Sequence, residues 1–455
     1  MSDVRAFLIR HRELLLVTLA ALLVRLVWNL SIHRPLDYAF SDMGGYLERA
    51  QTSIDRPDEK LGYFTLFPWG THFLLSLVKR AFGRDNGTAI GITYALLGAG
   101  AVAYSFLLAR RLTRGAWIPR VVAAILVFYY PWISLGGYTL SEPPFTFFLA
   151  ATAYYALEVA DRGRPRDAWL FGVSLAAGCL FRPQILVALP LYGLHWILRR
   201  HAWRRFSPRL LVAVAVPLIF VLGVSMARMH FHLGRFGLIS NNGALNFAFG
   251  RCHALTISSV APDRKGAYSP PSLGALSRYE KAHPGSLVKL DPVMDPKLSF
   301  EGHMWYSAPL YRLAGQCVRQ GGLGRQVEFA ATHVALLWGF NTMWPDQNLG
   351  PAFRRPMEIA SDLHNALVLP AALVAMVLAF RRRNARVMLV ALHVFGLMAV
   401  AMLYFGDTRL RAPYDGMLVL LAVMTCASAY RLLRVRLARR ARSSLAPPAP
   451  PPAEA

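Results

Sequence analysis

The sequence predicts an all-α, polytopic membrane protein with about ten transmembrane helices, amphipathic helices beside the membrane and a small extracytoplasmic subdomain. Hydrophobic residues make up 55% of the 455 residues and charged residues only 16%, whereas soluble domains carry roughly 25% charged residues. Apolar runs long enough to cross a hydrocarbon core about 30 Å thick recur along the chain. Arginines cluster between alternate runs. Together these features argue against a soluble globular protein.

About ten apolar runs approach the length of about 20 residues that a membrane-spanning helix requires. The fifth and sixth are short and meet at Arg182-Pro183, so they form either a tight helical hairpin or one broken, re-entrant element. The first run has no obvious cleavage site of a signal peptide, so we expect it to remain as a helix. The predicted spans are 14–33, 88–109, 119–137, 142–160, 168–182, 183–198, 210–228, 363–380, 387–406 and 416–433.

Basic residues predict the orientation of these spans. The formal net charge is +25, which in a soluble protein would suggest nucleic acid binding. Here half of the basic residues lie at the ends of alternate spans, as the positive-inside rule expects of cytoplasmic loops. We therefore predict a plasma (inner) membrane protein with both termini in the cytoplasm and no nucleic acid partner. The clusters are Arg5, Arg10 and Arg12; Arg110, Arg111, Arg114 and Arg120; Arg162, Arg164 and Arg166; Arg199, Arg200, Arg204, Arg205 and Arg209; Arg381, Arg382, Arg383 and Arg386; and the arginines from Arg431 to Arg442.

This topology divides the chain into six parts. They are the cytoplasmic N-terminus with the first helix (1–33), a first extracytoplasmic segment (34–87), a transmembrane core (88–228), an extracytoplasmic subdomain (229–361), C-terminal transmembrane helices (362–433) and a basic, then Pro/Ala-rich, disordered cytoplasmic tail (434–455).

The two outer segments are too long to be simple connections, so each is expected to have its own helices. In the first, LERAQ (47–51) and HFLLSLVKRAF (72–82) are interpreted as short amphipathic helices on the membrane surface. For the first of these, a helix that faces water is an equally good interpretation. The second segment is polar and indicates a small folded subdomain. Its apolar run 328–344 is interpreted as interfacial or re-entrant, because an eleventh span would place the basic tail outside.

Cys252 and Cys317 both lie in the second outer segment. An oxidising exterior permits a disulfide between them. Two buried free thiols are an equally good alternative.

Charged residues at one depth suggest a single site. Dehydrating a charge is costly, so a charged residue in or beside a span is a candidate functional residue. The predicted topology places a set of them near the outer face: Arg25, Asp42, Glu142, Arg182, and, in the turn before the last span, Asp407, Arg409, Arg411 and Asp415.

Asp42 and Glu142 are the candidate catalytic acids. Asp42 either caps the helix that follows it or accepts a proton from a substrate hydroxyl or amine. Glu142, which precedes Pro143-Pro144, either complements a helix dipole or acts as a second acid. The sequence leaves open whether these two carboxylates share a divalent cation, and it contains no CxxC or HExxH motif.

Arg409 and Arg411 are candidate phosphate ligands. They stand at i, i+2 beside a proline in GDTRLRAPYDG. In an extended turn, both guanidinium groups would point the same way and bind one phosphate. The alternative is that each side chain reaches lipid headgroups. Two arginines in a short outer turn run against the positive-inside trend, so we favour phosphate binding.

Asp42, Tyr46 and Glu48 form a D-x-x-x-Y-x-E pattern after the first span. With the segments that follow, this pattern resembles the GT-C superfamily of integral membrane glycosyltransferases, in particular the branch of protein O-mannosyltransferases and the lipid A aminoarabinose transferase. The family's Lys-Pro-Pro is missing around Pro68, which puts carrier and acceptor preference in doubt. The other segments are YFTLFPWGTHFLLSL (63–77), LSEPPFTFFLAATAYYAL (140–157), LFRPQILVALP (180–190), SNNGALNFAFG (240–250) and DTRLRAPYDGMLVLLA (407–422).

The resemblance implies an inverting transfer of a sugar from a polyprenyl-phosphate donor to an acceptor glycan, lipid or protein on the extracytoplasmic side. Asp42 would act as the base. A leaving phosphate needs fixed positive charge, and Tyr46 and His72 would orient the substrate, with simple packing as the alternative for both. Members of the family vary in metal dependence, so the cofactor is unknown or a divalent cation. The candidate phosphate ligands are Arg409, Arg411, Arg182 and Arg25.

Two other classes share part of this pattern. A polyprenol-linked polysaccharide polymerase or ligase would have many spans, a large outer loop and outer-face arginines, but it does not by itself require the Asp42 motif. A lipid flippase or transporter would place polar residues near the bilayer midplane and often contain an internal repeat. We detect neither feature in the sequence.

Overall fold

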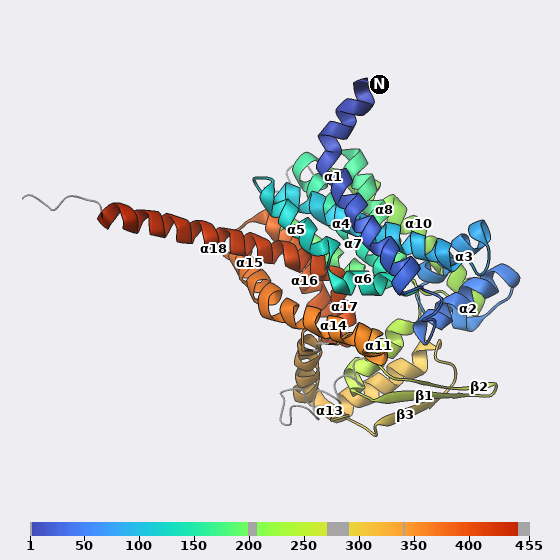
Figure 1. Ribbon diagram of the computed structural model, residues 1–455. Coiled ribbons are helices and arrows are strands. Elements are labelled where there is room, and N and C mark those ends of the chain that lie inside the picture. The colour runs from blue at the N-terminus through green and yellow to red at the C-terminus, as the bar shows by residue number, and fades with distance from the viewer. Residues whose placement is uncertain (1, 199–206, 271–290, 340–341, 445–455) are drawn as a thin grey trace, which may run out of the picture.

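The computed structural model describes residues 2–198, 207–270, 291–339 and 342–444 (Figure 1). Some predictions concern residues outside these ranges, and the structure does not address them. They are the positions of Arg199, Arg200, Arg204 and Arg205, a part of the apolar run 328–344, and the tail from 445 to 455, which was predicted to be disordered.

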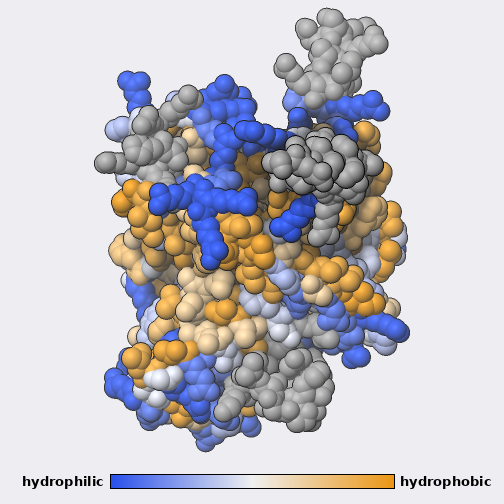
Figure 2. All heavy atoms as spheres, turned by 90° about the vertical axis from the view of Figure 1, so that its left-hand side faces the viewer, coloured by the Kyte–Doolittle hydropathy of each residue, from blue (hydrophilic) through white to orange (hydrophobic). Residues whose placement is uncertain are grey.

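Helices build most of the described chain. In Figure 1 the N-terminal end of α1 lies at the top, and a small sheet with α11 and α13 lies at the bottom. Figure 2 shows hydrophobic residues in a band across the middle of one face, with hydrophilic residues above and below it. This distribution is that of a protein whose middle faces lipid and whose two ends face water.

The predicted spans are helical, but fewer of them meet the requirements for crossing a membrane. Within the described ranges, six helices are long and apolar enough, or seven if the bent pair α5–α6 counts as one span. The stretches predicted as spans four to six form α7, α8 and α9. The helices of this part are α1 (Ser2–Val27), α4 (Gly87–Leu112), α5 (Trp117–Val127), α6 (Tyr130–Gly136), α7 (Glu142–Arg162), α8 (Pro165–Phe181), α9 (Ala188–Leu198), α10 (Pro208–Leu233), α15 (Leu369–Arg381), α16 (Ala385–Leu403) and α18 (Asp415–Ser444).

Two of the predicted spans, α7 and α8, do not meet these requirements for a physical reason. α7 has 21 residues but includes Glu142, Glu158, Asp161 and Arg162, so its hydropathy is lowered at both ends. α8 has 17 residues and ends before Pro183, whose ring and missing N–H prevent the helix from continuing. The chain resumes in a 3-10 turn, η3 (Pro183–Val187), before α9. Ten spans are therefore not confirmed.

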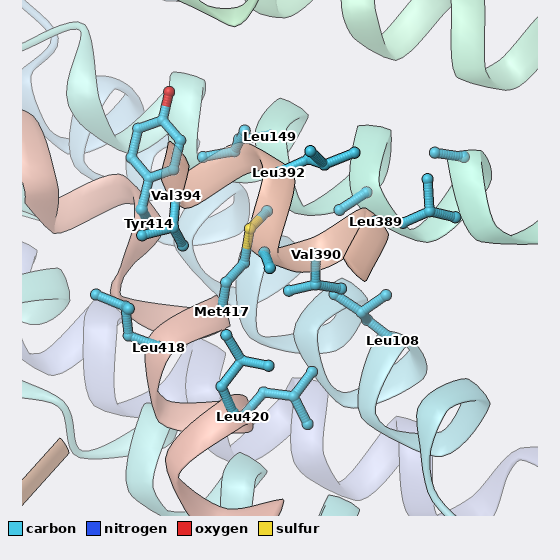
Figure 3. Packing of buried hydrophobic residues seen from close by; sticks show 14 of the residues in the cluster. Leu108, Leu149, Leu389, Val390, Leu392, Val394, Tyr414, Met417, Leu418 and Leu420 are labelled. Carbon is cyan, nitrogen blue, oxygen red and sulfur yellow. The ribbon is translucent and has the colours of Figure 1, made fainter. Parts of the chain in front are cut away.

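The largest of three hydrophobic clusters among the described residues packs most of the long helices together. Figure 3 shows part of it, where leucine and valine side chains of α16 meet those of α4, α7 and α18. Val390, Leu418 and Leu420 are each almost fully buried. Because lipid surrounds this part, tight packing between the helices is an important source of their association.

The first outer segment forms the two predicted helices, α2 (Asp42–Asp55) and α3 (Gly70–Phe82), with a 3-10 turn, η2 (Gly62–Thr65), between them. α3 buries Leu75 and Val78 but exposes Phe73, Leu77 and Phe82. An exposed apolar stripe suits a helix that lies in the membrane interface. That location remains a prediction.

The second outer segment corrects the all-α prediction, because it contains a three-stranded sheet in the order β2-β1-β3. β1 pairs antiparallel with β2 and parallel with β3. The Cys252–Cys317 disulfide, one of the two alternatives, joins α11 to α13. The elements are α11 (Asn242–Cys252), β1 (Thr256–Ala261), β2 (Arg264–Tyr268), β3 (Lys297–Glu301), α13 (Ser307–Leu336), η4 (Asp346–Asn348) and α14 (Pro351–Leu363), and the return to the membrane helices runs through η5 (His364–Val368).

Candidate active site

Four segments that are far apart in the sequence meet at one point. Asp42 is the first residue of α2, Glu142 is the first residue of α7, and Arg182 lies between α8 and η3. Arg409 lies in a short helix, α17 (Thr408–Arg411), which leads through η6 (Ala412–Tyr414) into α18. All four charged side chains therefore come from the first residue of a helix or from a short segment between two long helices.

Local sequence explains each of these positions. Pro143 and Pro144 occupy the first turn of α7, where a missing backbone N–H costs nothing. Asp407 caps α17, because its Oδ1 accepts a hydrogen bond from the backbone N–H of Arg409 at 2.7 Å. Ser41, just before Asp42, has a φ of 50°. Such a conformation costs a non-glycine residue of order 1–3 kcal/mol and is concentrated at functional sites.

Arg409 joins the two acids. Its Nη1 lies 3.0 Å from Oδ2 of Asp42, and its Nε donates to Oε1 of Glu142. Arg182 binds the same Oε1 through Nη2, and its Nε donates to Oγ of Ser141 at 3.2 Å. The two acids and two arginines thus form one ion cluster, which we call the acid–arginine cluster.

The members of the acid–arginine cluster differ in exposure. The side chain of Glu142 is 0% exposed, that of Arg409 7% and that of Arg182 11%, whereas that of Asp42 is 26% exposed. Asp42 is therefore the carboxylate that a substrate can reach. The polar partner found for the Asp42 side chain is Arg409, and the helix-capping alternative receives no support because no side-chain cap is formed at this end of α2.

Tyr46 lies one helical turn after Asp42 and is buried against Phe67. Burial and the negative charge of Asp42 raise the pKa of Tyr46 to about 12. The phenol is therefore protonated at neutral pH and able to donate a hydrogen bond. Glu48, the third residue of the motif, is exposed on the opposite side of α2 and does not join the cluster.

Arg411 does not lie beside Arg409, which corrects the prediction of an extended turn. The segment is helical, and residues two apart on a helix point to nearly opposite sides. Arg411 is fully buried and pairs through Nε with Asp415 at 3.2 Å, and its Nη1 donates to Oδ1 of Asn365 at 3.0 Å. The shared phosphate that motivated the prediction has no support in this geometry.

Arg25 and His72 lie away from the acid–arginine cluster. Arg25 is buried and donates to the carbonyl oxygens of Leu126 and Val127, so it stabilises the bend between α5 and α6. His72 lies with its Nε2 3.1 Å from Nη2 of Arg228. Burial, aided by the charge of Arg228, holds the pKa of His72 well below its usual range.

Two residues near the site were not predicted. The guanidinium of Arg409 stacks over the ring of Trp344, 4.3 Å from its centre. Arg49, in α2, is buried between the rings of Tyr63 and Phe67. The sequence offered a signal for Arg49, since it follows Tyr46 by three residues on the same helix. It offered none for Trp344, because this contact joins distant segments.

α13 packs against the segment that leads into the helix of Arg409. The backbone N–H of Gly406 donates to Nδ1 of His333 in α13 at 3.3 Å. A Cβ on Gly406 would lie 1.7 Å from the carbonyl oxygen of His333. Only glycine permits this approach, so α13 and the segment before α17 are locked together.

The two carboxylates do not offer an open metal site as they stand, because the guanidinium of Arg409 binds both. Over the part of the chain that the structure describes, no group of three or more His, Cys, Asp or Glu side chains could hold a metal ion. A divalent cation at Asp42 and Glu142 would have to displace Arg409. The arrangement suits a ligand with negative charge, such as a phosphate.

Comparisons with known proteins agree with the resemblance found in the sequence. Residues 62–239 match the family of dolichyl-phosphate-mannose-protein mannosyltransferases. The archaeal oligosaccharyltransferase AglB from Archaeoglobus fulgidus, solved with an inhibitory peptide and a dolichol-phosphate, aligns with a TM-score of 0.51 and 10% identity over 96% of this chain and 52% of that chain. ArnT from Cupriavidus metallidurans, solved with undecaprenyl phosphate, aligns with a TM-score of 0.40 and 15% identity over 91% of this chain and 77% of that chain. No curated protein sequence matches.

The predicted resemblance to GT-C glycosyltransferases is confirmed by the family match and by the fold shared with AglB. The chain spans about half the length of AglB.

Proposed function

We propose that the chain is a membrane glycosyltransferase that moves a sugar from a polyprenyl-phosphate donor to an acceptor on the extracytoplasmic side, with inversion at the anomeric carbon. The observation that carries this proposal is the acid–arginine cluster, in which one accessible carboxylate lies beside two arginines that are held in place. The family match over 62–239 and the shared fold support the same reaction class.

Asp42 is the proposed base. Arg409 binds its Oδ2, which leaves Oδ1 to accept the proton from an acceptor hydroxyl. As that oxygen attacks the anomeric carbon, the bond between this carbon and the phosphate oxygen breaks, and the polyprenyl phosphate leaves with the electron pair. A positioned base typically contributes 10²–10⁴-fold to the rate of such a step.

Arg409 and Arg182 are the proposed ligands of the leaving phosphate. The hydrogen bonds described above use Nε and Nη1 of Arg409 and Nε and Nη2 of Arg182. One nitrogen of each guanidinium, Nη2 and Nη1 respectively, is left for a phosphate oxygen. Fixed donors of this kind stabilise the charge that develops on a leaving group.

Glu142 was predicted as a catalytic acid, and we propose a narrower role for it. Its side chain is fully buried, and Oε1 binds both arginines. A substrate cannot reach it without displacing Arg409 or Arg182. Glu142 is therefore proposed as a positioning residue that orients the two phosphate ligands.

The orientation in the membrane is also a proposal. In α7, Glu142 of the acid–arginine cluster begins the helix, and Arg162 of a basic cluster ends it. Arg110 and Arg111 end α4 in the same way, and Arg381 ends α15. The positive-inside rule then places the acid–arginine cluster outside a plasma (inner) membrane and both termini in the cytoplasm.

A divalent cation as cofactor remains a prediction. Titration of the purified chain with a chelator tests it. Transfer that continues with excess chelator would contradict metal dependence, whereas loss that Mg²⁺ or Mn²⁺ restores would support it.

The function itself is tested by deleting the gene and extracting lipid-linked sugars. We expect a polyprenyl phosphate that carries one sugar to accumulate, and the wild-type gene to reverse this. Accumulation of a polyprenol-linked oligosaccharide instead would favour a polymerase or ligase. No change in lipid-linked sugars would contradict the proposal.

A further inference from the structure

A cavity of about 700 Å³ opens beside the end of α10, away from the residues of the acid–arginine cluster. It lies where the end of α10 meets the segment before η2 and the connection from β3 to α13. Its walls include Lys60, His230, His232, Trp305 and Tyr306. We call it the basic–aromatic cavity.

The charge of the basic–aromatic cavity is one-sided. Lys60 is the cationic side chain of its lining, beside the rings of His230 and His232, and no carboxylate of the described residues lines it. Arg235 lies at its edge, where Nη2 donates to the carbonyl oxygen of Trp305 at 3.3 Å and the guanidinium stacks over the ring of Tyr306 at 5.1 Å. Cations held in this way favour a ligand that carries a carboxylate or phosphate group.

The aromatic wall is rigid. The ring of His303 stacks on Trp305, with 4.2 Å between ring centres. On another side, Gly62 touches the indole so closely that a Cβ there would lie 2.3 Å from its Nε1. A fixed indole beside polar groups is typical of pockets that orient a small ligand, and its flat apolar face suits the C–H face of a sugar ring.

A series of contacts leads from this cavity to α2, the helix that begins with Asp42. The ring of His232 stacks on Phe64, whose carbonyl oxygen accepts a hydrogen bond from Arg228. Arg49 donates through Nε to the carbonyl oxygen of Tyr63, the residue before Phe64, at 3.2 Å, and it shares α2 with Tyr46. The wall of the basic–aromatic cavity is thus in contact, through Phe64 and Arg228, with the region that packs on α2.

We propose that the basic–aromatic cavity binds the acceptor, and that the acceptor is an anionic saccharide. Its acid group would contact Lys60, His230 and Arg235, and a sugar ring would pack against Trp305. The role of this saccharide as the acceptor rests on the proposed glycosyltransferase function. Its binding to the cavity does not, because binding does not require transfer.

The test is direct binding to the purified full chain in nanodiscs of phosphatidylcholine, without donor, measured by calorimetry. The probes are a galacturonic acid disaccharide and the neutral galactose disaccharide of the same linkage. We expect the acidic probe to bind at least about tenfold more tightly, because charge-assisted hydrogen bonds are added. The double variant Lys60→Gln/Arg235→Gln, which changes two exposed side chains, should weaken this binding by about tenfold or more.

Two further variants make the result specific. Arg319→Gln removes an exposed arginine of α13 that does not line the cavity. It should bind the acidic probe as the wild type does. Trp305→Ala should weaken both probes. Equal affinity for the two probes, or unchanged binding by the Lys60→Gln/Arg235→Gln variant, would overturn the proposal.

A lipid headgroup could supply the same anionic chemistry. Glycerol 1-phosphate is therefore added as a competitor; if it displaces the disaccharide more effectively than galacturonic acid does, the cavity binds a headgroup and the proposal is wrong. Anionic binding by a wild type that transfers no sugar would contradict the proposed function alone. Transfer with unchanged acceptor KM and unchanged binding in the double variant would contradict the cavity proposal alone.

Discussion

Glu142 and Glu158 stand at opposite ends of α7, and each is a buried carboxylate that binds two arginines. Glu158 pairs with Arg111 at 2.5 Å and with Arg162 at 2.8 Å. The two residues share a helix, a charge and a type of partner. They differ in that only Glu142 contacts the arginines proposed to bind phosphate.

Comparing variants of Glu142 and Glu158 therefore distinguishes a role of Glu142 in sugar transfer from a role in stability alone. Removing one member of a buried ion pair costs about 3–5 kcal/mol, so we expect both Glu142→Gln and Glu158→Gln to lower the free energy of unfolding. Glu142→Gln should also lower kcat by about 100-fold or more, because Arg409 and Arg182 lose the oxygen that orients them. Turnover is measured per folded molecule. Equal loss of kcat in both variants would assign Glu142 a purely structural role.

At the scale of elements, α17 shows why part of the site could not be predicted. The sequence indicated that Arg409 and Arg411 are unusual in an outer turn, and Arg409 does join the acids. It did not indicate a helix, because the four residues of α17 depend on a cap from Asp407. Arg409 also meets Asp42 across 367 residues of sequence, a contact that no local pattern reveals.

The buried contacts of Arg411 lead to a second prediction. Arg411→Gln leaves Asp415 without its cation, so we expect a loss of about 3 kcal/mol in stability and an unchanged donor KM. The double variant Arg411→Gln/Asp415→Asn should be more stable than the single variant, since the buried charge is removed as well. Thermal unfolding in detergent measures both. A single variant with wild-type stability and a raised donor KM would instead support the phosphate contact predicted from the sequence.

η4 begins at Asp346, two residues after Trp344, whose ring contacts the guanidinium of Arg409. Asp346 accepts hydrogen bonds from Ser134 and from Tyr138, the latter at 2.7 Å. Burial nevertheless raises the pKa of Asp346 to about 6, against these hydrogen bonds. The folded protein therefore binds this proton more tightly than the unfolded chain does.

The sign of the pH dependence follows from this shift. A carboxyl with a raised folded-state pKa contributes stability below the unfolded pKa of about 4, and that contribution is lost as the pH rises through about 6. We expect the melting temperature of the wild type to fall over this window, and Asp346→Asn to flatten the profile. Asp55→Asn, at an exposed carboxylate paired with Arg84, is the control. Parallel profiles for wild type and Asp346→Asn would refute this account.

At the scale of the whole molecule, hydropathy predicted where helices lie because insertion into lipid requires apolar runs. Ten spans are not confirmed, since six or seven of the described helices are long and apolar enough to cross a membrane and α7 and α8 are not among them, because of their charges or short length. The sheet was missed because its strands are short and partly polar. β1 also pairs with β3, a segment about 40 residues later in the sequence, and such non-local pairing leaves no local pattern.

The orientation can be tested on intact cells with single cysteines. Cys426, an exposed free cysteine, is first replaced by serine. We expect a membrane-impermeant maleimide to label Arg56→Cys, which follows α2, in intact cells, and Arg114→Cys, which follows α4, only after permeabilisation. Both positions are exposed. Labelling in the reverse order would place the acid–arginine cluster in the cytoplasm.

The central claim is that the acid–arginine cluster transfers the sugar with Asp42 as base. The most direct measurement is transfer by the purified Asp42→Asn variant, supplied with the lipid-linked sugar that accumulates in the deletion strain. Asparagine is nearly isosteric and can still accept a hydrogen bond from Arg409, so the variant should fold and bind the donor. We expect its turnover to fall by about 10²–10⁴-fold or more. Wild-type turnover in this variant would contradict the account.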